Sequence, residues 1–254
     1  MPFLRDRLSL YGGTALAFVY FPEIYRLSVD VDFNYHHLDE EDWGIVRDGI
    51  DRDLKRVLYT MRYKESDLSI DASYPLGRIT VDSTSRGGLR DSFKIEVGYM
   101  RRIPILRQDS LESYRHPAGG EAFKILTPRR DELFANKWCT MLYRGSSRDL
   151  FDVHRIAELP IDIDTFRVCA VVDSLMRGPP KLNEVDANET IERIPVDSGL
   201  LNLLKRGSND FSPDEARRLT KEFSKEIPIR LNEGSETRDQ PIPRRSHFQA
   251  RTNR

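Results

Sequence analysis

Two aspartates one residue apart have the clearest capacity for chemistry in this sequence. Asp30 and Asp32 alternate with Val29, Val31 and Phe33, which is the period of a β-strand with one apolar face. On such a strand both carboxylates point the same way, and their charges repel. A divalent cation between them would remove that repulsion. The pair therefore predicts a site for Mg²⁺ together with a nucleotide phosphate.

A glycine pair further upstream fits the same chemistry. Gly12 and Gly13 permit a tight turn and a close backbone approach to a ligand. Thr14 is a candidate cap for a short helix that begins at Ala15. Free N–H groups at such a helix start attract phosphate. A phosphate cradle followed by two carboxylates predicts phosphoryl or nucleotidyl transfer.

A third carboxylate lies on a later predicted strand. Over residues 93–98, apolar positions alternate with Lys94, Glu96 and Gly98, so Glu96 lies on a polar strand face. Short strands are also predicted at 68–70 and 79–81, with a glycine-rich hairpin link at 85–88. A glutamate on such a strand face is usually a solvated residue. The alternative is that Glu96 completes a metal site.

Two predicted helices add further candidates. A helix beginning at Thr127–Pro128 has Lys137 within its apolar stripe, where it either extends to the surface or reaches phosphates. The next helix holds Asp149 and Asp152 three residues apart, on one side. Taken alone, these aspartates would be surface salt-bridge partners of Arg148 and Arg155.

The remaining segments supply supporting elements. The sequence predicts an amphipathic helix at 43–61 with Asp39 as a candidate cap, a buried helix at 166–175, a strand-like start followed by a short helix at 191–204, and a helix at 213–223 capped by Ser212. His36 and His37 are expected to be surface loop residues. From residue 232 onward no apolar period remains, so 232–254 is expected to be a disordered tail.

Charge and composition restrict the class of protein. The 254 residues carry a net charge of −1, so any nucleic-acid site must be a local patch. The candidates for such a patch are Arg101, Arg102, Arg107, Arg129 and Arg130, which are otherwise solvated residues. Two cysteines are too few for a disulfide framework. No apolar run is long enough for a membrane helix or a signal peptide, so a cytoplasmic protein is expected.

The sequence resembles a known family in its first 34 residues. GGTALAFVY followed by RLSVDVDF resembles the signature of the nucleotidyltransferase superfamily, a glycine turn, a helix and Asp-x-Asp. Arg26, Ser28 and Asp30 make it more similar to the AbiEii-type toxins of type IV toxin–antitoxin systems.

This resemblance implies roles for the candidate residues. Asp30, Asp32 and Glu96 would hold Mg²⁺ or Mn²⁺, and Lys137 would neutralise the phosphates of a nucleoside triphosphate. The nucleotide-binding residues would be Gly12, Gly13, Thr14, Arg26, Ser28 and Lys137. Asp152 would be the functional acid, either a base for the acceptor hydroxyl or an orienter of Lys137, with Asp149 as second choice.

The resemblance also implies a fold and an activity. The expected fold is α/β (α+β), with a nucleotidyltransferase-like mixed sheet and helices over residues 1–117, a helical domain over 118–231, and the active site between them. The expected reaction transfers NMP from an NTP to an acceptor hydroxyl. The acceptor is expected to be RNA, with tRNA the leading candidate, and a cognate antitoxin is expected to restrain the toxin.

Three other interpretations remain open. The acceptor can be a small-molecule or protein hydroxyl, or the chain can be a non-catalytic relative that only binds a partner. A calcium-binding module is the third, because Asp30, Asp32, Asn34 and Glu41 imitate an EF-hand loop. Tyr35 stands where that loop needs glycine, and the module would require a helix–loop–helix over residues 24–54.

Overall fold

The computed structural model describes residues 1–36, 40, 42–84, 87–116, 118–205 and 211–227. His37, Asp39, Glu41, Ser85 and Arg86, for which the sequence suggested roles, lie outside these residues, as does the predicted tail at 232–254. Within the described part of the chain, no helix combines the length and apolar character needed to cross a membrane.

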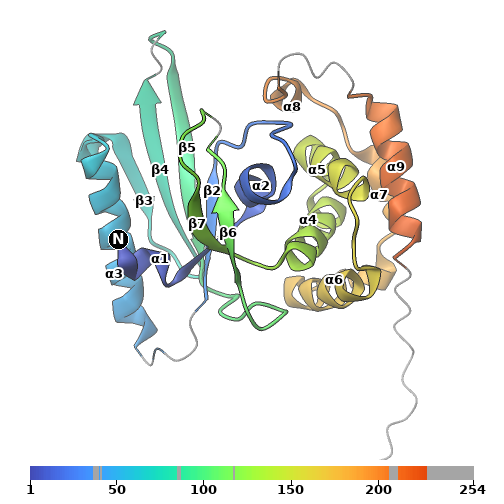
Figure 1. Ribbon diagram of the computed structural model, residues 1–254, viewed down its shortest axis with the longest axis horizontal. Coiled ribbons are helices and arrows are strands. Elements are labelled where there is room, and N and C mark those ends of the chain that lie inside the picture. The colour runs from blue at the N-terminus through green and yellow to red at the C-terminus, as the bar shows by residue number, and fades with distance from the viewer. Residues whose placement is uncertain (37–39, 41, 85–86, 117, 206–210, 228–254) are drawn as a thin grey trace, which may run out of the picture.

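A mixed five-stranded sheet forms the first half of the molecule (Figure 1). Its strands are β1 (Leu8–Tyr11), β2 (Val31–Tyr35), β3 (Leu68–Asp71), β4 (Leu76–Thr84) and β5 (Arg90–Gly98), in the order β1-β2-β5-β4-β3. The β2–β5 pair is parallel and the other pairs are antiparallel. The alternation read at 68–70, 79–81 and 93–97 therefore predicted three strands correctly.

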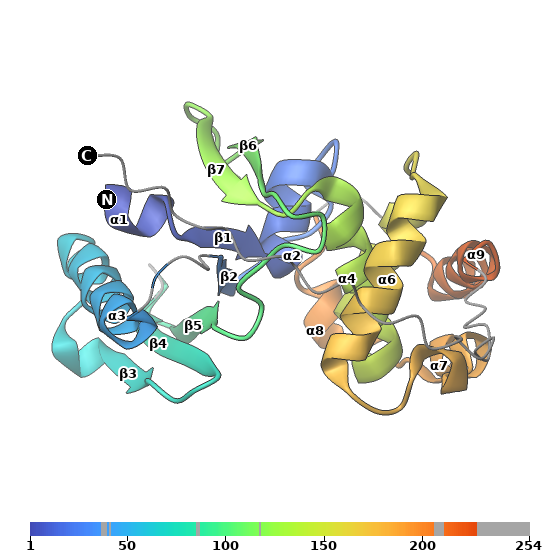
Figure 2. The same ribbon diagram turned by 90° about the horizontal axis from the view of Figure 1, so that it is seen from below.

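Helix α3 (Trp43–Thr60) covers the apolar face of this sheet, with the short helix α1 (Pro2–Arg5) beside it. Ile50, Leu54 and Leu58 of α3 pack in one cluster with Ile79 and Val97 of the sheet. Burying such side chains stabilises the layer by about 1.5–3 kcal/mol each. The opposite face of the sheet, which includes Asp32 and Glu96, faces a cavity that Lys137 and Arg144 of the second half of the molecule also line. That half lies beside the sheet (Figure 2).

A second, two-stranded sheet follows the first, and only its second strand lies within residues 118–231, where helix was expected. Strand β6 (Ser110–Tyr114) pairs with β7 (Phe123–Thr127), and β7 packs on β1. Thr127 is the last residue of β7, and its Oγ1 donates to the carbonyl of Leu10 at 2.9 Å. The predicted helix start at Thr127–Pro128 is therefore too early. The Thr127 hydroxyl binds β1 at the end of β7 and does not cap the helix, which begins at Arg130.

The second half of the molecule is helical. Its helices are α4 (Arg130–Arg144), α5 (Ser147–Ala157), α6 (Ile163–Arg177), η3 (Leu182–Glu184), α7 (Ala187–Arg193), α8 (Ser198–Leu201) and α9 (Pro213–Lys225). Serine and aspartate are favoured at N-caps, and the side chains of Ser146, Asp162, Asp186, Asp197 and Ser212 accept backbone N–H bonds there. Ile191 lies in α7, so the strand-like start predicted for 191–204 is wrong.

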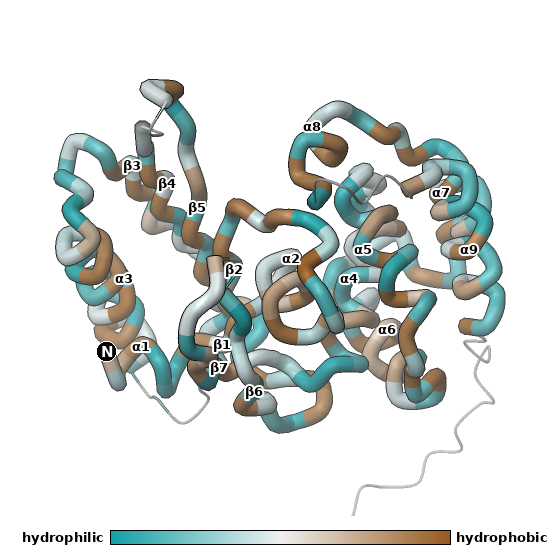
Figure 3. Tube along the Cα trace, turned by 45° about the horizontal axis from the view of Figure 1, so that its top comes forward, coloured by the Kyte–Doolittle hydropathy of each residue, from teal (hydrophilic) through white to brown (hydrophobic). Residues whose placement is uncertain are grey.

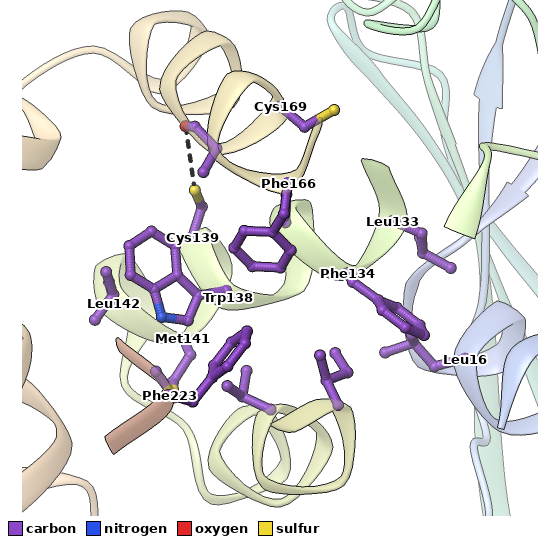
Figure 4. Packing of buried hydrophobic residues seen from close by; sticks show 14 of the residues in the cluster. Leu16, Leu133, Phe134, Trp138, Cys139, Met141, Leu142, Phe166, Cys169 and Phe223 are labelled. Carbon is purple, nitrogen blue, oxygen red and sulfur yellow. Dashed lines mark hydrogen bonds between the residues drawn. The ribbon is translucent and has the colours of Figure 1, made fainter. Parts of the chain in front are cut away.

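The main hydrophobic core joins the helices to the glycine segment. After β1 the chain forms α2 (Gly12–Ala15) and a π-helical turn, η1 (Leu16–Tyr20), which lie between the sheet and the helices. Leu16 packs beside Phe134 of α4, and the same core contains Trp138 and Phe166, whose ring centroids are 6.0 Å apart (Figure 4). Hydrophobic residues from 10–21 and from 133–227 thus share one core.

This shared core bears on the predicted domain division at residue 117. The division stays a prediction, since residues 10–21 pack with the helical half although they precede most of the sheet.

The outer helices α3 and α9 carry hydrophobic and hydrophilic residues along their lengths, as amphipathic helices do (Figure 3). The predicted fold class, an α/β sheet unit with a helical unit, is confirmed.

Candidate active site

A cavity of about 520 Å³ lies between the polar face of β2 and β5 and the surface of α4. Among the described residues, its acidic lining side chains are Asp30, Asp32 and Glu96. Its basic ones are Arg26, Arg78, Lys94, Arg101, Lys137, Arg144, Arg148 and Arg177. Basic side chains therefore outnumber acidic ones in the lining although the chain as a whole has a net charge of −1. Such a concentration of cations favours a polyanionic ligand.

Strand register brings the carboxylates together. Asp32 of β2 lies directly opposite Glu96 of β5 in the parallel pair, and Asp30 immediately precedes β2. Burial and the nearby Glu96 charge raise the pKa of Asp32 to about 6. Asp32 and Glu96 thus share a partly desolvated site, and ionising both of them there costs free energy.

Each of the other two carboxylates has a neighbour of its own. Glu96 accepts a hydrogen bond from Arg78 Nε at 2.6 Å, across the β4–β5 pair. Asp30 accepts from the backbone N–H of Lys94 at 3.2 Å, and Arg148 lies 4.0 Å from its other oxygen. In the described part of the chain, no three acidic, histidine or cysteine side chains are already grouped as metal ligands.

The glycine pair is required by the protein's own side chains. Gly12 has φ +69°, and a Cβ there would lie 2.0 Å from Asp32 Oδ2. A Cβ on Gly13 would lie 2.6 Å from Arg26 Nη2. Only glycine therefore lets Asp32 and Arg26 lie against this turn. Helix α2 begins here with no side-chain cap, and both glycines line the cavity.

Thr14 has a different position from the predicted one. The helix begins at Gly12, so Thr14 is inside its first turn and does not cap it. The Thr14 hydroxyl donates to the carbonyl of Asp30 and lies 3.0 Å from Ser28 Oγ. The side chain is buried and is not part of the cavity lining, so it braces the approach to β2.

Arg26 and Asp152 form a buried ion pair between segments 126 residues apart. Arg26 donates from Nε at 2.7 Å and from Nη2 at 2.6 Å to the two oxygens of Asp152. Residues around Arg26 are held in place because Leu27 N–H donates to the carbonyl of Leu203 at 2.8 Å. Burial alone would raise the pKa of Asp152, but the Arg26 and Lys137 charges offset this and hold it below its usual value.

Lys137 joins this pair to a second buried aspartate. Its Nζ lies 2.9 Å from Asp152 Oδ2 and 3.0 Å from Asp149 Oδ1. Asp149 also accepts two bonds from Arg144, at 2.7 and 2.8 Å, and one from Ser146 at 2.6 Å. Burial would raise the pKa of Asp149, but Lys137 and Arg144 lower it further than burial raises it. Lys137 lines the cavity, whereas neither aspartate does.

The structure adds cavity residues that the sequence did not single out. Arg177 of α6 lines it, together with Asn136 and Thr140 of α4. Asp173, fully buried, pairs with both Arg101 and Arg177. The four-residue spacing of Asn136, Thr140 and Arg144 indicates that they share one side of a helix. No local pattern in the sequence indicates that Arg177 of α6 lines the same cavity.

The predicted basic patch is divided between different places. Arg101 lines the cavity described above. Arg129 and Arg130 line a separate cavity of about 500 Å³, which also contains Asp131 and Asp162. Arg102 lies over the ring of Tyr35, with 5.4 Å from its Cζ to the ring centroid.

Two further expectations need correction. His36 is not a surface loop residue: its side chain is 5% exposed, and Nδ1 lies 2.7 Å from Asp109. The calcium-binding interpretation is wrong, because Asp32 and Asn34 are in strand β2 and residues 24–30 do not form a helix.

Comparison with known proteins identifies a shared fold and a family. The structure is similar to that of MenT4, a nucleotidyltransferase toxin from Mycobacterium tuberculosis H37Rv, with a TM-score of 0.59 and 17% identity, over 89% of this chain and 77% of that one. At that identity the similarity shows a shared fold. A second structure, an antigenic nucleotidyltransferase-like protein from Paracoccidioides brasiliensis, has a TM-score of 0.38 and 14% identity over 77% of this chain and 88% of that one, which is too distant to support an argument.

Curated proteins gave no match to the sequence. The family comparison is decisive, since residues 1–241 match the family described as nucleotidyl transferase AbiEii toxin, type IV TA system. The Gly12–Gly13 turn, the Asp30/Asp32 pair and the basic cavity therefore lie in a chain that belongs to the AbiEii family of nucleotidyltransferase toxins.

Proposed function

We propose that this nucleotidyltransferase moves an NMP group from an NTP to a hydroxyl of RNA, with tRNA the leading acceptor, in a reaction that needs Mg²⁺ or Mn²⁺. The observation that carries the proposal is the register of Asp32 against Glu96, beside the Gly12–Gly13 turn and within a basic cavity. Cognate antitoxin control and a cytoplasmic location belong to the same proposal.

The carboxylates fit a divalent cation in chemistry. Asp30, Asp32 and Glu96 line the same cavity and would supply hard oxygen ligands. Burial and the nearby Glu96 charge raise the pKa of Asp32, and a bound cation would offset the cost of ionising it. When bound, such an ion neutralises phosphate charge and makes the α-phosphorus more open to attack. Glu96 would bind the ion through Oε2, because the Arg78 hydrogen bond is made to Oε1.

The other residues bind and orient the triphosphate. Gly13 offers an uncapped helix start, and Ser28 and Lys137 also line the cavity. Lys137 presents a fixed positive charge because Asp149 and Asp152 hold its Nζ. The phosphates therefore meet a cation whose position is set before binding.

Asp152 is assigned to positioning. Both its oxygens accept from Arg26, one also contacts Lys137, and the side chain is buried. A base for the acceptor hydroxyl must reach the substrate, and this carboxylate does not line the cavity. Of the two predicted roles, orientation of Lys137 is the one we propose, and Asp149 shares it.

The decisive experiment is transfer with the purified full chain. Each of the four α-³²P-labelled NTPs is incubated with total RNA, with a protein acceptor mixture or with small hydroxyl compounds, with Mg²⁺, Mn²⁺ or EDTA. We expect label on RNA, in the tRNA size range, that EDTA abolishes. Label on protein or small molecules alone would replace the acceptor proposal with the alternative one.

Matched variants connect this activity to the cavity. Asp32→Asn removes a cavity carboxylate and is expected to abolish transfer while the fold is retained. Asp164→Asn is the control, because Asp164 is 90% exposed on α6 and pairs only with Arg167 among the described residues. Full transfer by Asp32→Asn would refute the carboxylate site, and no transfer by the wild type to any acceptor would support a non-catalytic relative.

A further inference from the structure

Asp173 is a fully buried carboxylate that holds two arginines at the cavity wall. It lies on α6 and forms ion pairs with Arg101, which follows β5, and with Arg177, one turn later on α6. Asn136 Nδ2 of α4 donates to Asp173 Oδ1 at 2.8 Å. Three separate segments thus meet at Asp173. Its contacts fix the positions of the donor groups around it before any ligand binds.

The guanidinium groups of both arginines are only partly used by the protein. Arg177 donates from Nη2 to Thr140 Oγ1 at 2.8 Å and to the Asn136 carbonyl at 3.3 Å. Within the described residues, no hydrogen bond uses Nη1 of Arg177 or Nε of Arg101. Both side chains line the cavity and are about one-fifth exposed, at 22% and 19%.

These arginines are held by a different carboxylate from the other cations along α4. Along α4, Lys137 and Arg144 are held by Asp149 of α5, whereas Asn136 and Thr140 contact Arg177 of α6. The cavity therefore has two groups of fixed cations, one held by Asp149 of α5 and one by Asp173 of α6. One carboxylate between two arginines leaves a positive charge that no described acidic neighbour pairs.

We propose that Arg101 and Arg177, positioned by Asp173, form a second phosphate-binding subsite of the cavity, built on a different carboxylate from the one that holds Lys137 and Arg144. Arginine forks bind phosphate oxygens in two-point contacts, and their orientation here is set before the ligand arrives. This inference rests on the proposed function, because the phosphate belongs either to the NTP or to the acceptor RNA. Asp173 acts through the arginines and is a positioning residue.

The test measures binding at equilibrium, so that it does not depend on turnover. Each NTP with Mg²⁺ is titrated calorimetrically, and fluorescently labelled bulk tRNA is titrated by anisotropy at several salt concentrations. Arg177→Gln and Arg101→Gln are expected to weaken binding of one of these ligands by about tenfold or more, because a charge-assisted hydrogen bond is lost. For RNA, each lost phosphate contact should also reduce the salt slope by about 0.7 to 0.9.

Arg193→Gln is the matched control, because Arg193 also pairs with an acid one turn earlier, Glu189, but is 76% exposed and outside the cavity. Arg177→Lys keeps the charge and should restore part of the affinity. Asp173→Asn retains both arginines and adds net positive charge, so weaker binding of the same ligand by this folded variant is the result expected if Asp173 positions them.

The ligand whose affinity falls identifies the source of the phosphate. Weaker NTP binding assigns the subsite to the triphosphate, and weaker tRNA binding assigns it to the acceptor. Unchanged binding of both ligands by folded Arg101→Gln and Arg177→Gln would overturn the subsite. Loss of the subsite and loss of transfer are distinguishable, because a wild type that binds but never transfers refutes the proposed function alone.

Discussion

The ionised Asp32 carboxylate is expected to lower the free energy of unfolding, and the Asp32→Asn substitution is expected to raise it. The carboxylate is largely withdrawn from water and lies opposite Glu96, and together these effects raise its pKa from 3.8 to about 6. One pKa unit corresponds to about 1.4 kcal/mol, so the ionised form costs the folded state on the order of 3 kcal/mol at pH 7. The Asp32→Asn variant carries no charge at this position and avoids that cost.

The sign of the pH dependence follows from proton binding. Between about pH 4 and pH 6 the folded state holds a proton on Asp32 that the unfolded state has lost, so the wild-type free energy of unfolding falls as the pH rises. The stability advantage of Asp32→Asn should therefore be near zero below pH 4 and complete above pH 6. For a protein of this size, that advantage corresponds to a rise in melting temperature of roughly 6–12 °C.

Urea unfolding followed by circular dichroism, at pH values from 4 to 8, measures this difference. Asp164→Asn, on an exposed turn of α6, should show no comparable gain. Mg²⁺ or Mn²⁺ should stabilise the wild type and have little effect on Asp32→Asn, since binding to the folded state raises stability. A folded Asp32→Asn that is no more stable than the wild type at pH 7 would refute the assigned strain.

Two further changes follow from the same contacts. Gly12→Ala should abolish transfer and lower stability, because its Cβ would lie 2.0 Å from Asp32 Oδ2 and φ is +69°; transfer assays and thermal melts check this, and wild-type activity would contradict the close approach. Asp152→Asn should cost about 3–5 kcal/mol, because it leaves Arg26 and Lys137 short of a buried counter-charge; urea unfolding measures it, and a loss below about 1 kcal/mol would show that the pair is not a stabilising contact.

The sequence alone determined the local parts of the site. The two-residue period predicted the strands that carry Asp32 and Glu96, whereas Asp30 lies immediately before β2, and all three carboxylates line the cavity. The glycine pair predicted a turn that needs backbone freedom, and Gly12 has the positive φ that glycine permits. Helices α3, α4 and α5 also followed from spacing, because helix and strand periods are properties of neighbouring residues.

Only the tertiary structure decided which of these parts meet. No spacing predicts that Glu96 lies opposite Asp32, since strand register depends on pairing between segments far apart in the chain. The Arg26–Asp152 pair spans 126 residues, and Asp173 collects its partners from three segments. Burial converts ordinary aspartates into fixed anchors for cations, and burial is a consequence of packing that no local pattern contains.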